Sequence, residues 1–111
     1  MNIEQRHYVQ MAEIEIDPAQ FEPYRAAVTE TAVRVEPGVL VLYAISEKDS
    51  PARVKVFEIY RDTEAYRSYL ETAHFGKYKA TTEKMVRSLK LVQTTPIMLG
   101  AKATVRAPQS L

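Results

Sequence analysis

The segment Val39–Ser46, with the sequence VLVLYAIS, is apolar at almost every position. Successive side chains of a β-strand point to opposite faces, so a strand here would be apolar on both faces. The run is short and rich in the residue types that favour strands over helices. It therefore predicts a strand that is covered on both sides, and the rest of the fold must supply that cover.

Three other segments complete a predicted sheet. Tyr8–Ile16 alternates apolar and polar side chains with the period of a half-buried strand. Val54–Arg61 follows a polar turn over residues 47–53, and we expect it to be the hairpin partner of the doubly apolar strand. A last strand is expected roughly over Leu91–Leu99, where Pro96 predicts an edge or a bulge.

Helical spacing fills the intervals between these strands. Asp17 can cap a first helix, and Pro18 fits its first position. Asp62 predicts the cap of a second helix over residues 63–73, and helical spacing continues over His74–Leu89. The apolar stripe of the first helix is expected to consist of Phe21, Tyr24, Val28, Ala32 and Val35.

The resulting order, β-α-β-β-α-β, predicts an α+β ferredoxin-like fold with an antiparallel sheet. The 111 residues fit a single domain, with a tail from about residue 101. Two helices cover only one face of such a sheet, so Val39–Ser46 would leave the other face apolar. A large exposed apolar face usually marks an interface. We therefore expect a homodimer whose sheets pack face to face into an α/β barrel.

Composition excludes several classes of function. The absence of cysteine removes disulfides, thiolate chemistry and cysteine-built metal sites. The 15 Lys and Arg residues against 14 Asp and Glu give a net charge of +1, so we expect neither a nucleic-acid nor a membrane partner. His7 and His74 are distant in sequence, and we expect no metal site. Without a visible signal peptide or membrane-spanning run, we expect a cytoplasmic protein.

Glu58 is the first candidate for chemistry. Val54, Val56 and Tyr60 share its strand face, so its carboxylate is expected to lie among apolar side chains. Desolvation raises the pKa of a carboxyl toward neutrality, which suits a general acid or base. The alternative is a structural carboxylate that is paired with a nearby Arg, Lys or Tyr.

His74 and Tyr78 are four residues apart and share a helix face with Thr82 and Met85, which predicts that both point inward. Such a pair could bind a phenolic oxygen or carry a proton. The alternative is a core histidine that is satisfied at the start of a helix. Four tyrosines could line an aromatic cavity or serve as half-buried core, namely Tyr60, Tyr66, Tyr69 and Tyr78.

Three segments carry a family resemblance: EPGVL at Glu36–Leu40, VFEIYRDTEAY at Val56–Tyr66 and LETAHFGKY at Leu70–Tyr78. Together they resemble the antibiotic biosynthesis monooxygenase family, and within it the quinol monooxygenase branch. The resemblance covers roughly residues 6–100. It implies a dimer with sheets packed face to face, and a pocket in each subunit between the helices and the sheet.

The resemblance also implies a monooxygenase that needs no cofactor and oxidises a small hydroxylated aromatic of the quinol type with O2. Its catalytic candidates are Glu58 or His74 as the base, and Tyr78 to orient the substrate oxygen. The substrate-binding walls would be Phe57, Tyr60 and Tyr69.

Two other functions stay open. An isomerase or epimerase of a small polyhydroxylated signalling metabolite could use the same base. A dimeric binding protein without catalysis would use only the pocket. A haem-degrading relative of this fold uses an Asn, a Trp and a His, whereas this chain has no Trp and its one Asn is Asn2. The haem function is therefore disfavoured.

Overall fold

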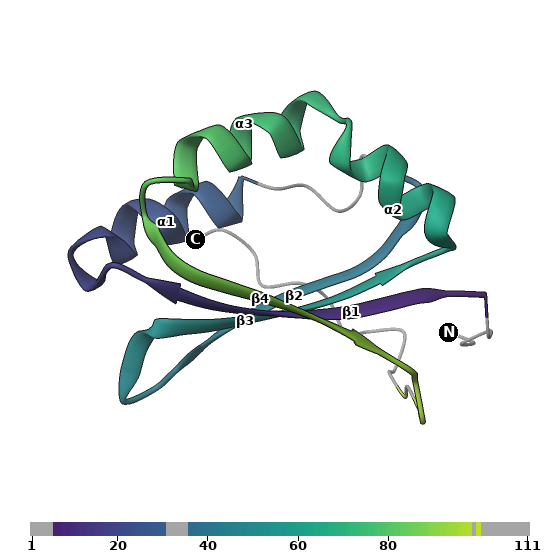
Figure 1. Ribbon diagram of the computed structural model, residues 1–111, viewed down its shortest axis with the longest axis horizontal. Helices are drawn as coiled ribbons and strands as arrows, with labels where there is room; N and C mark the ends of the chain where they lie inside the picture. The colour runs from purple at the N-terminus through teal and green to yellow at the C-terminus, as the bar shows by residue number, and fades with distance from the viewer. Residues whose placement is uncertain (1–5, 31–35, 99, 101–111) are drawn as a thin grey trace.

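The computed structural model describes residues 6–30, 36–98 and 100. Four strands form one antiparallel sheet in the order β2-β3-β1-β4 (Figure 1). The strands are β1 (Tyr8–Ile16), β2 (Val39–Glu47), β3 (Ser50–Tyr60) and β4 (Val86–Thr94). The bounds of the first strand agree with the alternation in the sequence.

Three helices lie together on one face of this sheet (Figure 1). They are α1 (Phe21–Thr29), which follows the short 3-10 helix η1 (Pro18–Gln20), then α2 (Thr63–Leu70) and α3 (Ala73–Thr82). The predicted ferredoxin-like α+β fold is therefore confirmed. None of the helices in the described part of the chain is long and apolar enough to cross a membrane.

The β2–β3 hairpin is confirmed, but its turn is tighter than expected. Glu47 pairs with Ser50, so only Lys48 and Asp49 connect the two strands. The polar composition of residues 47–53 predicted a longer turn. Backbone pairing extends both strands into this polar segment, because exposed polar side chains are compatible with a strand end that projects into solvent.

The prediction of a helix from His74 to Leu89 was wrong at its C-terminal end. Helix α3 ends at Thr82, and β4 begins at Val86 rather than at Leu91. Met85 and Leu89 are four residues apart and fit a helical stripe, but pairing with β1 overrides this local preference. Leu89 and Leu91 lie opposite Ile14 and Ala12 of β1. The strand also ends at Thr94, before the proline at position 96.

Side-chain caps mark the starts of η1, α2 and α3, whereas α1 follows η1 without a cap of its own. Asp17 accepts a hydrogen bond from the Ala19 N–H, and Asp62 accepts one from the Ala65 N–H. Thr72 caps α3 through the Phe75 N–H, which separates α2 from α3. Helix α1 ends at Thr29, and the predicted stripe residues Ala32 and Val35 lie outside the described residues.

The core between helices and sheet has two parts. One cluster, under α1 and α3, is centred on the buried residues Ala12, Ile14, Ile16, Tyr24 and Val54. The other, under α2, is centred on Val39, Tyr60, Ala65 and Tyr69. Gln10 and Glu58 belong to neither cluster. Each stands on its strand between a residue of one cluster and a residue of the other, so a polar seam divides the core.

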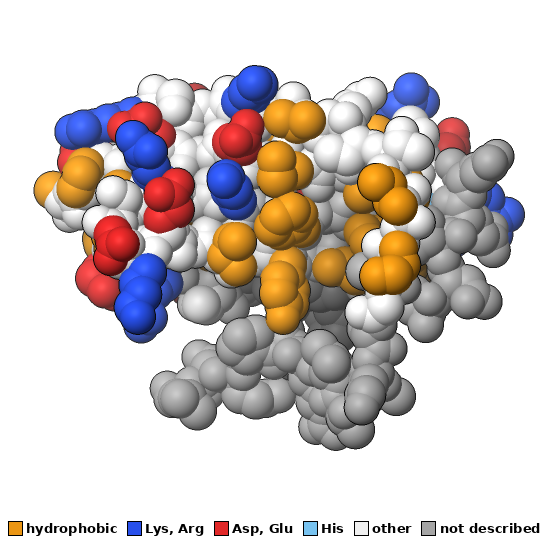
Figure 2. Space-filling view, turned by 90° about the horizontal axis from the view of Figure 1, so that it is seen from below, with side chains coloured by type: hydrophobic (Ala, Val, Ile, Leu, Met, Phe, Trp, Pro, Cys, Tyr) orange, Lys and Arg blue, Asp and Glu red, His pale blue; other side chains and the backbone are white. Residues whose placement is uncertain are grey.

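The opposite face of the sheet carries no helix. One row of side chains crosses all four strands there, made by Tyr43, Phe57, Met11 and Val92. Tyr43 is 46% exposed and Phe57 is 42% exposed. Figure 2 shows this face, with apolar side chains gathered over the strands beside a charged region. The single chain therefore leaves part of its sheet apolar and open.

Candidate functional site

Glu58 lies on β3 directly opposite Gln10 of β1, on the sheet face that the helices cover. Val56 precedes it in one part of the core, and Tyr60 follows it in the other. The alternation of β3 sets this orientation, because residues two apart share a face. The carboxylate is partly buried, and it is directed into the space between the sheet and the helices.

Two neutral groups donate hydrogen bonds to this carboxylate. The Tyr60 hydroxyl lies 2.5 Å from one Glu58 oxygen. The Gln10 amide nitrogen lies 3.5 and 3.4 Å from the two oxygens. Burial raises the pKa of the Glu58 carboxyl, and these two hydrogen bonds oppose the rise because they favour the charged form. The result is a carboxyl with a pKa above its ordinary value, as a general base requires.

A continuous row of aromatic rings begins at Tyr60, whose hydroxyl bonds Glu58. Tyr60 packs against Tyr69 with ring centroids 5.7 Å apart, and Phe75 connects Tyr69 to Tyr78 at 5.2 and 6.1 Å. Tyr8 stacks on Tyr66 at 4.3 Å. The helices thus present mostly phenol rings to the carboxylate. Phenols supply both apolar walls and polar hydroxyls, which suits an aromatic ligand that carries oxygen.

Tyr78 reaches from α3 toward α1. Its hydroxyl lies 2.8 Å from that of Tyr24, which is 2% exposed. Burial raises the pKa of both phenols, and it also raises the pKa of Tyr69 to about 12. These hydroxyls therefore remain protonated at neutral pH. The Tyr69 and Tyr78 hydroxyls can donate hydrogen bonds to a substrate oxygen but cannot act as bases there, and Tyr24 is too deeply buried to reach a substrate.

His74 stands at the start of α3 with its ring 5.8 Å from that of Tyr69. Its Nε2 atom is buried, and it has no hydrogen-bond partner among the residues described here. A buried polar atom without a partner is destabilising by about 1–3 kcal/mol. Such an atom is a reason to expect a ligand or a water molecule at this position.

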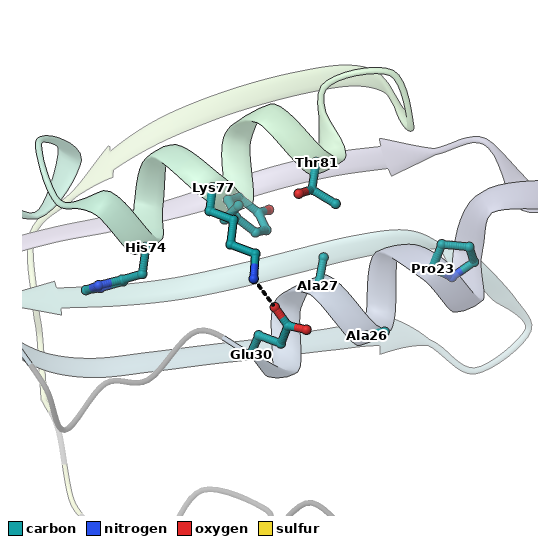
Figure 3. A pocket seen from close by; sticks show the side chains of 8 residues that line it. Pro23, Ala26, Ala27, Glu30, His74, Lys77 and Thr81 are labelled. Carbon is teal, nitrogen blue, oxygen red and sulfur yellow. Dashed lines mark ion pairs between the residues drawn. The ribbon is translucent and has the colours of Figure 1, made fainter.

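A groove of about 440 Å³ separates α1 from α3 (Figure 3). Small side chains of α1, Pro23, Ala26 and Ala27, form one wall, and Tyr78 lines the other side together with His74. Lys77 and Glu30 form an ion pair across it, with 3.5 Å between Nζ and Oε2. Both side chains are well exposed, so this pair contributes little stability and opens easily.

The structure brings together most of the side chains that the sequence predicted. Tyr60 donates a hydrogen bond to Glu58, its ring packs against that of Tyr69, and Phe75 connects Tyr69 to Tyr78. Burial first, and the charge of Glu58 in addition, raises the pKa of all three phenols. His74 joins them through Tyr69. The structural alternative for Glu58 holds in part, since a tyrosine does pair with it.

The placement of Phe57 in this pocket was wrong. Phe57 pairs with Met11 and Tyr43 on the face of the sheet that carries no helix, and it is 42% exposed. The reason is the period of two, which sends neighbours of Glu58 to the opposite side. Phe57 therefore does not contact what Glu58 contacts.

Gln10 is the site residue that the sequence reasoning missed. It is 4% exposed, and it binds both Glu58 and Tyr8. The available signal was a polar residue at an inward position of β1, between Tyr8 and Ala12. Buried amides are rare unless their hydrogen bonds are satisfied. A glutamine at an inward strand position therefore indicates a candidate site residue, as a glutamate at such a position does.

The arrangement is suited to proton transfer. It contains one carboxyl with a raised pKa, one imidazole and several protonated phenols. No group of three or more metal-binding side chains occurs among residues 6–30, 36–98 and 100. The site can remove a proton from a bound hydroxyl, hold the resulting anion with phenol donors, and surround it with aromatic rings.

Comparisons with known proteins agree with this fold. The model of the antibiotic biosynthesis monooxygenase family matches residues 7–81. A Bacteroides thetaiotaomicron structure, named as a candidate antibiotic biosynthesis monooxygenase, is 44% identical, with a TM-score of 0.83 over 89% of this chain and 97% of that chain. A similarly named structure from Nitrosomonas europaea is 19% identical, with a TM-score of 0.78 over 87% of this chain and 96% of that chain.

A candidate monooxygenase from Lactobacillus acidophilus is 24% identical, with a TM-score of 0.77 over 86% of this chain but only 46% of that chain. These two more distant structures show the fold alone. No curated protein matches the chain. The family match spans more than half of the sequence, and it includes all three segments that carry the resemblance. The chain therefore belongs to the antibiotic biosynthesis monooxygenase family.

Proposed function

We propose that this protein is a monooxygenase that oxidises a small hydroxylated aromatic of the quinol type with O2 and without a cofactor. The observation that carries the proposal is the Glu58 carboxyl. It has a raised pKa, it is held by neutral donors, and it faces a row of phenol rings. Family membership supports the oxygen chemistry, and the aromatic surroundings support the substrate class.

The reaction begins with removal of the substrate hydroxyl proton by Glu58. The anion is electron-rich and transfers an electron to O2, after which the oxygen bonds to a ring carbon. The resulting peroxide loses water: one oxygen atom remains as a carbonyl of the quinone, and the other leaves with the hydroxyl proton and the hydrogen of that ring carbon. The aromatic ring is itself the reductant. The protein contributes the base, the orientation and the exclusion of water.

The other side chains have separate roles in this proposal. Tyr78 donates to the substrate oxygen, and Tyr60 and Tyr69 form the walls. His74, whose Nε2 lacks a partner among the described residues, binds a second substrate oxygen or serves as the alternative base. The substrate would enter through the groove between α1 and α3, which Tyr78 and His74 line and Glu58 does not.

We further propose that two copies pair through the sheet face that carries no helix. Tyr43 and Ile45 of β2 are 46% and 47% exposed there, and Phe57 is 42% exposed. Beside them, Glu13 of β1 stands between Lys55 and Lys90 of the neighbouring strands, so the charged region carries both signs. A second copy would cover the apolar row and could match charges with the same surface.

Oxygen consumption with a panel of hydroquinones and naphthols tests the proposed function. We expect uptake above the uncatalysed rate, a fall of about 10²–10⁴-fold in Glu58→Gln, and no residual activity in Glu58→Gln combined with His74→Ala. A Lys79→Ala variant on the exposed side of α3 is the matched control. Full activity in the double variant would contradict the assignment of the base. Turnover that persists without oxygen would indicate an isomerase, and thermal stabilisation without turnover a binding protein.

A further inference from the structure

A row of polar side chains crosses the inner face of the sheet at the level of Glu58. Gln10 of β1 stands opposite Glu58 of β3 on one side and opposite Gln93 of β4 on the other. Gln10 is one of two buried polar residues in the described part of the chain, the other being Thr82. The row occupies the seam between the two parts of the core, where packing alone would favour apolar side chains.

The hydrogen bonds in this row all point the same way. The Gln93 amide donates to the Tyr8 hydroxyl at 3.2 Å, and that hydroxyl donates to the Gln10 carbonyl oxygen at 2.8 Å. The Gln10 amide nitrogen then donates to both oxygens of Glu58. Hydrogen bonds that run head to tail polarise one another, so the row favours a negative charge at its end.

The orientation of the Gln10 amide follows from its neighbours. The Tyr8 hydroxyl donates to the carbonyl oxygen, which leaves the N–H groups for Glu58 and for the Tyr66 hydroxyl. A flipped amide would place its oxygen against the carboxylate, and two acceptors repel one another. Tyr8 is in turn held by stacking on Tyr66, with ring centroids 4.3 Å apart. The amide nitrogen is thus the group turned toward the carboxylate, at 3.4 and 3.5 Å from its two oxygens.

Among the described residues, the side chains that face Glu58 from the other elements are an aliphatic residue and phenols, which are neutral. His74 and Glu36 are the titratable groups next in line, and both interact with Tyr69. Leu42 lies opposite it on β2, Tyr66 and Tyr69 approach from α2, and Tyr78 approaches from α3. None of the ion pairs between described residues includes Glu58. Within the described part of the chain, the charge of the carboxylate is therefore balanced by hydrogen bonds from Tyr60 on its own strand and from Gln10 on the neighbouring strand.

We propose that Gln10 is a positioning residue, which holds the Glu58 carboxylate in its charged form and in one orientation, and that Tyr8 and Gln93 act through it. This inference rests on the proposed role of Glu58 as the base. Gln10 does not touch the substrate. Its effect on the reaction passes through the fraction of Glu58 that is ionised and through the direction of the carboxylate.

The test is a direct titration of the Glu58 carboxyl carbon by NMR in the full-length protein. In Gln10→Leu, which keeps the approximate volume and removes the donors, the Glu58 pKa should rise by on the order of one pH unit. The acid limb of the pH profile of kcat/KM should move upward by the same amount. Thr82→Val is the matched control, because it removes a buried polar group that is bonded to the Tyr78 carbonyl and not to Glu58. It should leave the Glu58 titration unchanged.

Tyr8→Phe keeps the test decisive if Gln10→Leu does not fold, since it removes only the hydroxyl that orients the amide. It should raise the Glu58 pKa in the same direction by a smaller amount. An unchanged Glu58 titration in whichever of these variants folds would overturn the proposal. The NMR reading does not depend on turnover, so a protein that shows the pKa shift but consumes no oxygen would refute the proposed function and leave the role of Gln10 intact.

Discussion

The hydroxyl groups of Tyr24 on α1 and Tyr78 on α3 lie 2.8 Å apart and join two helices that otherwise flank an open groove. Tyr24 is almost completely buried, whereas Tyr78 also reaches the groove. The pair therefore connects the core to the space in which we place the substrate. The Tyr24 hydroxyl holds the Tyr78 hydroxyl in place, and Tyr24 has no other role in the proposed site.

Tyr24→Phe and Tyr78→Phe should each destabilise the fold, and together by less than the sum. We expect a coupling free energy of about 1 kcal/mol, because either change alone breaks the same bond. Denaturation of the wild type, both single variants and the double variant measures it. Strictly additive effects would show that the bond contributes no stability. On activity, Tyr78→Phe should cause the larger loss, since only Tyr78 would contact the substrate.

Glu58 should make the protein less stable as pH rises. Its folded-state pKa lies above its ordinary value, so between these two values the folded state binds more protons than the unfolded state. The free energy of unfolding therefore falls across this window. Glu58→Gln cannot ionise and should lose this part of the pH dependence, becoming relatively more stable than the wild type at neutral pH. Urea denaturation of both proteins at pH 4 and pH 8 checks this. A wild-type advantage that grew with pH would contradict the raised pKa.

Gly38 is required by a close approach between the start of β2 and α2. A Cβ atom at this position would lie 2.6 Å from the Cβ of Ala65, whereas one at Gly76 would meet nothing within 4 Å. Gly38→Ala should therefore destabilise the fold by about 1–3 kcal/mol. The matched change Gly76→Ala, within α3, should stabilise it by up to about 1 kcal/mol. Thermal unfolding compares the two, and equal shifts would contradict this packing.

Phe57→Lys should break the proposed pairing of two copies. The substitution places a charge in the middle of the apolar row, where a second sheet would otherwise exclude water. Light scattering should give twice the 12.7 kDa chain mass for the wild type and a single chain mass for the variant. Ala80→Lys adds the same charge on an exposed position of α3 and should leave the mass doubled. A wild type that is monomeric at micromolar concentration would contradict the pairing.

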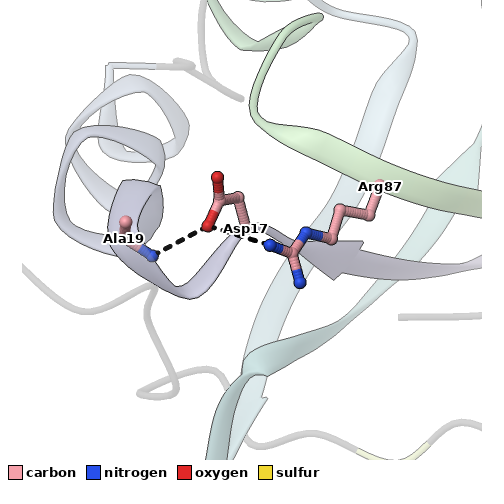
Figure 4. Close-up of polar contacts among 3 residues, drawn as sticks. All are labelled: Asp17, Ala19 and Arg87. Atoms are coloured by element: carbon pink, nitrogen blue, oxygen red, sulfur yellow. Dashed lines mark hydrogen bonds and ion pairs between the residues drawn. The ribbon is translucent and has the colours of Figure 1, made fainter.

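Local sequence rules predicted much of the fold because they act over a few residues. The alternation over Tyr8–Ile16 and the caps at Asp17 and Asp62 concern near neighbours, and all three were confirmed. The start of β4 was missed because it depends on pairing with a distant strand. The contact between Asp17 and Arg87 also depends on segments that are distant in sequence. An Asp17 oxygen and an Arg87 nitrogen lie 3.3 Å apart, although the two residues are 70 positions apart in the chain (Figure 4).

The residues of the candidate site also divide into those that local patterns predict and those that depend on pairing between distant segments. Glu58 could be found from its own strand, because a carboxylate among apolar residues is visible in the sequence. Gln10 becomes a site residue because the strand register places it opposite Glu58. A local sequence pattern does not predict that register. Phe57 was misplaced for the converse reason: a family resemblance suggested a wall, while the alternation of its own strand already directed it to the other face.

Mass spectrometry of the product formed under 18O2 tests the central claim most directly. If Glu58 enables direct reaction of a hydroxylated aromatic with oxygen, the quinone should carry one atom of 18O and the second should appear in water, with no hydrogen peroxide released. Glu58→Gln should form this labelled product at a rate lower by orders of magnitude. An unlabelled product, or labelled quinone formed equally fast without the Glu58 carboxylate, would contradict the account.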